Sequence, residues 1–229
     1  MKIQTILSAA FLVSSAWLSS CSTPFAELEK DPNRPVNVPS SLVLQGIESD
    51  MYQNTGRPFS ASSRWNQFYC SNYNYYATNE YTWTETPNHY FTLKNVVKME
   101  EEAIRSGAEP VNPYSALGKF FRAFFFDEMT KRVGDLPMKQ ALAGIENFSP
   151  AYDSQKDIYV QMLAWCEEAN ADMTSLIAKG QNTVAGDFYF NGDVRKWQKV
   201  VNAFHVRLLL ELSQKENESG LNIKAKFAE

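Results

Sequence analysis

The chain has 229 residues, a hydrophobic content of 44% and a formal net charge of −4. A chain of this length can bury a core of its own. A mildly acidic chain without a basic stripe excludes nucleic acid as a partner, because phosphate binding needs clustered lysine and arginine. The aromatic share is high at 14%, so we expect aromatic side chains to serve both packing and ligand contact.

The first residues are typical of a bacterial lipoprotein export signal. Lys2 supplies a positive start, residues 3–17 are mostly apolar, and Leu-Ser-Ser-Cys at residues 18–21 places small side chains before a cysteine that can be acylated. Serines and other polar residues interrupt the apolar stretch, whereas a permanent membrane span needs about 20 predominantly apolar residues. We therefore expect residues 1–20 to be a signal peptide and Cys21 to carry the lipid, palmitate included. A plain secretory signal with an incidental cysteine is the alternative.

Residues 21–40 follow the signal and are rich in proline and charge. This composition favours an extended tether between the lipid and a folded domain. We expect that domain to occupy residues 41–229. An extracytoplasmic location permits a disulfide between Cys70 and Cys166. Since neither cysteine lies in a close-spaced motif, two buried thiols are the expected arrangement.

Beyond residue 88 the apolar residues repeat with helical periodicity. The predicted helices run from about residue 90 to a stop at Gly107, from an N-cap and proline at 112–113 to 133–134, from a cap at Ser154 to 179–180, and from Asp193 onward. Their predicted buried faces are Leu93, Val96, Val97, Ala103 and Ile104; Leu117, Phe120, Phe121, Phe124 and Phe125; Ile158, Met162, Cys166, Ala169, Met173 and Leu176; and Val194, Trp197, Val201, Phe204, Leu208 and Leu212. A shorter helical start is expected from Ser41. The predicted fold class is all-α, with tetratricopeptide-like helical pairs and long irregular loops, although the strict 34-residue consensus is absent.

Three stretches in this order resemble the SusD/RagB family of outer-membrane nutrient-uptake lipoproteins. They are Arg-Ala-Phe-Phe-Phe at 122–126 with Arg-Val-Gly-Asp-Leu-Pro at 132–137, Pro-Ala-Tyr-Asp-Ser-Gln at 150–155, and Asp-Phe-Tyr-Phe-Asn-Gly-Asp at 187–193 followed by Trp197, Asn202 and Arg207. The resemblance covers about residues 42–214. It implies a SusD-like α-helical fold and a lipoprotein that captures oligosaccharides, or in some members peptides. The implied partner is a TonB-dependent (SusC-like) transporter of the same membrane. Members of the family are usually much longer, so an incomplete, N-terminal portion of the fold is expected.

The residues of these motifs have structural explanations of their own. Asn191 and Gly192 suit a turn with positive φ, Asp193 can cap the next helix, and Gly134 can end a helix. Arg122 and Arg207, each inside an apolar helical run, are expected to pair with carboxylates or helix-end carbonyls rather than with a ligand. We therefore predict that the motifs maintain the fold.

A cluster of aromatic and amide side chains between residues 72 and 83 has a different character. It lacks helical or strict strand periodicity and is interspersed with asparagine and threonine. A sugar ring stacks its C–H face on tryptophan or tyrosine, while its hydroxyls need polar partners; large rigid rings also give much contact area for little lost entropy. Local packing under the loop is the alternative for each ring. The candidate ligand-binding residues are Trp83, Tyr81, Tyr75, Tyr76, Tyr73, Asn72 and Asn74.

Signals of catalysis are lacking in the sequence. It contains no nucleophile elbow, no His-Glu-x-x-His, no phosphate loop and no paired Cys-x-x-Cys motifs. His205 is expected to pack within its helix, and the three glutamates at 100–102 to form a solvated surface. We therefore expect a binding protein without enzymatic activity, cofactor or metal. A helical-repeat scaffold for a protein or peptide partner and, less favoured, a lipoprotein glycoside hydrolase are the alternatives.

Overall fold

The computed structural model describes residues 37–54, 66, 68 and 88–228, and the chain from Val38 onward forms one compact unit. Within the described ranges the helices are α3 (Ser40–Asn54), α5 (Tyr90–Arg105), α6 (Pro113–Val133), α7 (Gln155–Ala178), α8 (Val194–Glu211) and α9 (Ile223–Ala228), with 3-10 turns η2 (Gly144–Glu146) and η3 (Ser213–Lys215). Strand-like pairing in these ranges is limited to two isolated bridges. The predicted all-α class is confirmed.

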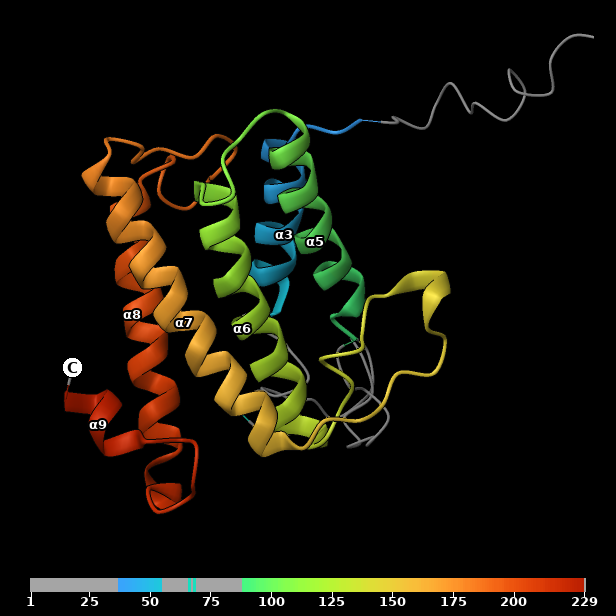
Figure 1. Cartoon of the computed structure of the whole chain (residues 1–229), viewed down its shortest axis with the longest axis vertical. Coiled ribbons are helices and arrows are strands. Elements are labelled where there is room, and N and C mark those ends of the chain that lie inside the picture. The colour runs from blue at the N-terminus through green and yellow to red at the C-terminus, as the bar shows by residue number, and fades with distance from the viewer. Residues whose placement is uncertain (1–36, 55–65, 67, 69–87, 229) are drawn as a thin grey trace, which may run out of the picture. The chain divides into compact units, whose positions relative to one another are not determined.

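The helices pack mainly on their neighbours in the chain. α3 lies against α5, α5 against α6, α6 against α7 and α7 against α8, and consecutive helices run in opposite directions (Figure 1). The bundle therefore has two ends. We call the tether end the one formed by Ser40, the 106–112 turn and the 179–193 loop. The opposite end, which we call the pocket end, holds the end of α3, residues 88–89 and the 134–154 loop.

Side-chain caps fix the helix boundaries that the sequence predicted. The Asn112 side chain accepts hydrogen bonds from the Tyr114 and Ser115 amides at 2.9 and 3.1 Å, and Pro113 takes the first helical position of α6. Ser154 accepts from the Asp157 amide at the start of α7, and Asp193 from the Arg195 amide at the start of α8. These oxygens satisfy amides that have no partner within the first turn.

An aromatic cluster joins α6 to α8 at the centre of the core. The Phe120 ring lies 5.5 Å from Phe121 and 5.7 Å from both Trp197 and Phe204, measured between centroids. Every residue of the faces predicted for α7 and α8 is buried. Cys166, on the α7 face, is a free buried thiol, and burial raises its pKa to about 12. Cys70 lies outside the described residues.

The predicted face of α5 was partly wrong. Ile104 is 49% exposed and Val97 only half-buried, whereas Met99 is fully buried. Val97 and Ile104 form a second apolar stripe beside the first, and contact with α3 and α6 buries the stripe of Leu93, Val96, Met99 and Ala103. In α6, Phe124 is also only half-buried.

The glutamates at 100–102 do not form a uniformly solvated surface either. Glu102 is buried and pairs with Arg105 and Lys98. Glu100 is largely shielded, because both of its oxygens bond the Arg122 guanidinium. Only Glu101 matches the expectation. Neighbouring cations on the same or the next helix make this burial of carboxylates possible. None of the helices in the described ranges has the length and hydropathy that a membrane crossing requires.

Candidate functional site

The predicted ligand-binding residues lie outside the described part of the chain. Trp83, Tyr81, Tyr75, Tyr76, Tyr73, Asn72 and Asn74 all fall between residues 69 and 87, and Cys21 precedes residue 37. After the aromatic cluster, the first described residues are Asn88, His89 and Tyr90, at the start of α5 and at the pocket end.

A cavity of about 370 Å³ lies at that point of the pocket end. It sits between the start of α5, the end of α6 and both ends of the 134–154 loop. Its lining combines two tyrosine rings and apolar side chains with one amide and one carboxylate. The lining residues are Asn88, Tyr90, Met129, Val133, Asp135, Leu136, Pro137 and Tyr152.

Tyr90 forms a fixed wall of this cavity. Its hydroxyl donates a 2.6 Å hydrogen bond to the Pro137 carbonyl, and its ring meets the Phe126 ring edge-on with centroids 6.2 Å apart. Burial, with smaller effects from Tyr152 and Asp153, raises the pKa of Tyr90 to about 12. The hydroxyl therefore remains a neutral donor over the physiological pH range, and it ties α5 to the loop.

Tyr152 is the exposed ring of the cavity, with 75% of its surface accessible. Its neighbour Asp153 holds the backbone in place: Leu136 and Asp153 exchange two main-chain hydrogen bonds of 3.2 and 3.1 Å. The Asp153 carboxylate also accepts from the Met138 and Lys139 amides, both at 2.9 Å. Burial would raise the pKa of Asp153, but these amides and the Lys139 ammonium outweigh it and lower that pKa. The exposed Tyr152 ring is therefore attached to a backbone that hydrogen bonds hold in place.

Two polar side chains border the rings. Asn88 accepts a 3.2 Å bond from the Tyr90 amide, and Asp135 accepts a 2.8 Å bond from the Gln155 amide at the start of α7. Both residues are exposed. Each bond uses one oxygen, so the Asn88 NH₂ group can still donate and the second Asp135 oxygen can still accept. One open ring face with a donor and an acceptor beside it can stack a sugar and bond its hydroxyls.

The loop that carries Tyr152 also displays apolar side chains that the sequence analysis did not single out. Ile145 is 85% exposed and Phe148 82% exposed. The loop projects from the helix ends beside the start of α5 (yellow in Figure 1). Large apolar residues in an aperiodic stretch interrupted by glycine and proline were the available signal. Exposed apolar groups of this kind mark interaction surfaces.

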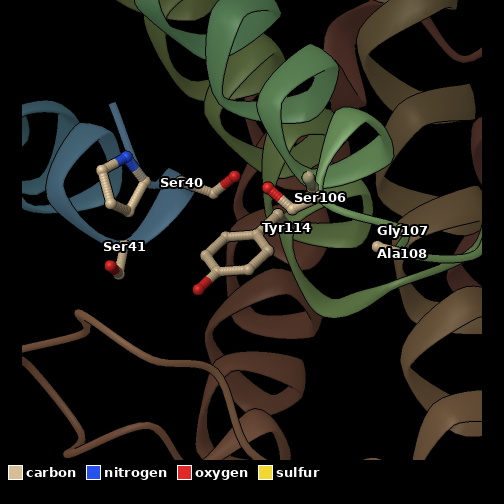
Figure 2. Close-up of a pocket in the computed structure, with 8 residues that line it drawn as sticks. Ser40, Ser41, Ser106, Gly107, Ala108 and Tyr114 are labelled. Atoms are coloured by element: carbon tan, nitrogen blue, oxygen red, sulfur yellow. The ribbon is translucent and has the colours of Figure 1, made fainter. Parts of the chain in front are cut away.

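Two further cavities lie away from the pocket end. One, of about 430 Å³, opens at the tether end, where Ser40, Ser41, Ser106 and Tyr114 converge from the starts of α3 and α6 and the end of α5 (Figure 2). The other, of about 710 Å³, runs along α5 and α6 and is lined by Val97, Ile104 and the Glu100–Arg122 pair. Neither adjoins the predicted aromatic cluster in sequence.

The two arginines of the family-like motifs pair with carboxylates, as predicted. Arg122 bonds Glu100, and Arg207 bonds the buried Asp127 at 2.9 Å, as does Lys131 at 2.7 Å. Burial raises the pKa of Asp127, while the two cations oppose that rise. His205 lies 3.8 Å from Glu167 on the side of α8. Among the described residues, no three His, Cys, Asp or Glu side chains are placed to hold a metal ion.

Comparison with known proteins agrees with this architecture. Residues 32–229 match the sequence model of a SusD-like family described as starch-binding and associating with the outer membrane. The chain belongs to this SusD-like family. No curated protein is similar enough to count as a relative.

Solved structures of SusD homologues have the same fold. A SusD homologue from Bacteroides fragilis is 31% identical, with a TM-score of 0.60 over 77% of this chain and 36% of its own. A second SusD homologue from that species and an outer-membrane protein of Bacteroides vulgatus described as involved in nutrient binding are each 28% identical, with TM-scores of 0.65 and 0.64, and each match covers 83% of this chain and 40% of the other. The SusD-like chain thus spans about two fifths of the length of these structures.

Proposed function

We propose that this SusD-like chain acts at the cell surface as a lipid-anchored protein that captures oligosaccharides for a partner TonB-dependent (SusC-like) transporter. The family match over residues 32–229 carries the proposal. The signal sequence ending at Cys21 supports the anchor. The tyrosine-lined cavity next to the predicted aromatic segment supports a glycan ligand.

The arrangement of the bundle suits such a role. The chain enters α3 at the tether end, while the cavity lies at the pocket end (Figure 1). α6 connects the two ends with 21 residues, which at 1.5 Å per residue is about 30 Å. In our proposal residues 1–20 are the signal peptide, 21–40 the lipidated tether and 41–229 the SusD-like domain, so that the ligand site stands away from the anchored end.

The proposed recognition uses stacking and hydrogen bonds. A sugar lies on the exposed face of Tyr152, within reach of Asn88 and Asp135, while Trp83 and the tyrosines of its segment add further rings. A shallow open cavity predicts weak binding per contact, with enclosure completed by the transporter. Capture requires no bond cleavage, so purified protein should release no products from polysaccharides.

Affinity electrophoresis in gels containing different glycans tests the ligand. We expect glycan gels to retard the full chain and Trp83→Ala to abolish the retardation. Tyr152→Ala should lower the apparent affinity about fivefold, since a stacked ring contributes on the order of 1 kcal/mol. Phe227→Ala, which removes an exposed aromatic ring on α9, serves as the matched control. Folded protein that no glycan retards would contradict glycan capture.

The exposed Ile145 and Phe148 favour one second candidate, a helical scaffold that binds a protein or peptide partner through the 134–154 loop. Affinity purification from membranes distinguishes the two functions. Recovery of a TonB-dependent transporter supports the uptake role. The scaffold function is supported if the chain binds no glycan and recovers a protein partner that the double variant Ile145→Ser/Phe148→Ser does not recover.

A separate variant tests the lipid anchor. We expect Cys21→Ser to lose both membrane association and palmitate labelling.

A further inference from the structure

Two buried carboxyl groups meet where the 179–193 loop crosses α3. Glu48, on α3, has no exposed surface, and Asp187, in the loop, is 8% exposed. Oε2 of Glu48 accepts the Phe188 amide at 3.0 Å, whereas Oε1 is buried and receives no hydrogen bond from an N–H donor. The amide that Glu48 accepts belongs to the residue that follows Asp187, so the loop brings a second carboxyl group close to Glu48. Among the described residues no cation pairs with Glu48. A buried carboxylate with one amide donor, no cation and an acidic neighbour is costly, so Glu48 holds a proton.

The surroundings assign that proton to Glu48. The Asp187 carboxylate accepts the amides of Tyr189, Phe190 and Gly192 at 2.9, 3.2 and 2.7 Å, so its oxygens already serve as acceptors. Glu48 accepts a single amide. The other titratable groups around it are Tyr189, whose hydroxyl donates to the Glu48 main-chain oxygen at 3.4 Å, and Tyr52, one turn further along α3. Burial raises the pKa of Tyr189, so its phenol is neutral at physiological pH.

We propose that Glu48 and Asp187 form a proton-operated latch that fastens the 179–193 loop to α3, tightening in acid and loosening as the pH rises. The latch joins residues 139 positions apart and sits at the tether end, remote from the proposed glycan site. The latch does not depend on the proposed capture of oligosaccharides.

The latch holds more than its own two side chains. The loop backbone lies so close to α3 that a Cβ on Gly186 would sit 2.2 Å from the Ser41 carbonyl oxygen. The Tyr114 hydroxyl donates to the Ala185 carbonyl at 3.1 Å. Ser41 and Tyr114 also line the tether-end cavity (Figure 2). Release of the loop would therefore widen this cavity and draw Tyr189 and Phe190 away from Trp197.

The direction of the pH effect follows from proton linkage. Burial and the neighbouring Asp187 raise the pKa of Glu48 to about 8, against the ordinary value of 4.5 in an opened, solvated loop. Between these two values the closed loop keeps a proton that the open loop loses. The ratio of closed to open loop is therefore highest at a pH below 4.5. It falls by about tenfold per pH unit above that pH and levels off near pH 8.

Hydrogen exchange of the full chain between pH 5 and 10 tests the latch, with rates divided by the intrinsic rate at each pH. For the Phe188, Tyr189, Phe190 and Gly192 amides we expect protection to fall by about tenfold per pH unit up to pH 8 and then to level off. Glu48→Gln keeps an acceptor for the Phe188 amide and is uncharged at every pH, so the protection of these amides should stay flat and exceed that of the wild type above pH 7. Glu101→Gln, the same change at an exposed site on α5, is the control.

Infrared spectroscopy gives an independent readout. At pH 6 the wild type should show the C=O band of a protonated carboxylic acid that is absent from Glu48→Gln and retained in Glu101→Gln. Parallel exchange profiles of wild type and Glu48→Gln, or an infrared difference spectrum without that band, would overturn the latch. Should Glu48→Gln not fold, the wild-type exchange profile and its infrared titration still decide the question.

Discussion

At the scale of single residues, three glycines differ in whether a side chain would meet backbone strain, steric crowding, both or neither. Gly192 has a φ of +85°, and a Cβ there would lie 2.6 Å from the Val184 carbonyl oxygen. Gly180 has a φ of +77° with open space around it, and Gly46 lies inside α3 with nothing within 4 Å. Gly192 thus combines backbone strain with steric crowding, Gly180 has backbone strain alone, and Gly46 has neither.

Alanine at these positions should give three different changes in the free energy of unfolding. We expect Gly192→Ala to lose about 3 kcal/mol from strain and collision together, and Gly180→Ala about 1 kcal/mol from strain alone. Gly46→Ala should gain up to about 1 kcal/mol from helix propensity. Urea unfolding followed by circular dichroism measures all three. Equal losses of unfolding free energy in Gly192→Ala and Gly180→Ala would show that the turn at residue 192 relaxes to accommodate a side chain.

At the scale of helices, the contact of α6 with α8 depends on one aromatic cluster. Phe120 is buried between Phe121, Trp197 and Phe204, so Phe120→Ala leaves a cavity that rings on two helices cannot fill. We expect a loss of about 3–5 kcal/mol. Phe91→Ala, at a 71% exposed site on α5, should change stability by less than about 0.5 kcal/mol. Similar denaturation midpoints for the two variants would contradict the assigned core.

The helices were predictable because their caps and stripes are local features. Ser154, Asp193 and the pair at 112–113 each mark a helix start from the side chains of a few consecutive residues. The burial of α5 was harder to predict, because Val97 and Ile104 form a stripe as apolar as the buried one. Only packing against α3 and α6 distinguishes the two.

The candidate site was less accessible to sequence reasoning. Tyr152 was noticed as part of a family-like motif, yet its exposure depends on the pairing of Leu136 with Asp153 across a long loop. The contact of Glu48 with Phe188 joins residues 140 positions apart, which no local pattern encodes. The aromatic segment around Trp83 was predicted from composition alone, and its role stays a prediction.

At the scale of the whole bundle, α6 occupies the central place. It contacts α5, α7 and α8, whereas α9 contacts α8 and α3 packs mainly on α5. Proteins with such neighbour-to-neighbour packing open locally from their less supported elements. We expect native-state hydrogen exchange to show the highest protection for amides in the middle of α6 and α7, and lower opening energies for α3 and α9. Uniform protection across all helices would indicate a single cooperative unit.

The separation of the two bundle ends has a consequence for how ligand preference evolves. The helices pack along their sides, and residues next to their own starts cap them. None of residues 139–151, the outer part of the 134–154 loop, is buried. This outer part therefore contributes little to the stability of the fold. Insertions, deletions and exchanges in it are tolerated better than changes within the helices. A scaffold of this kind acquires new specificities by replacing a connection while its framework is inherited unchanged.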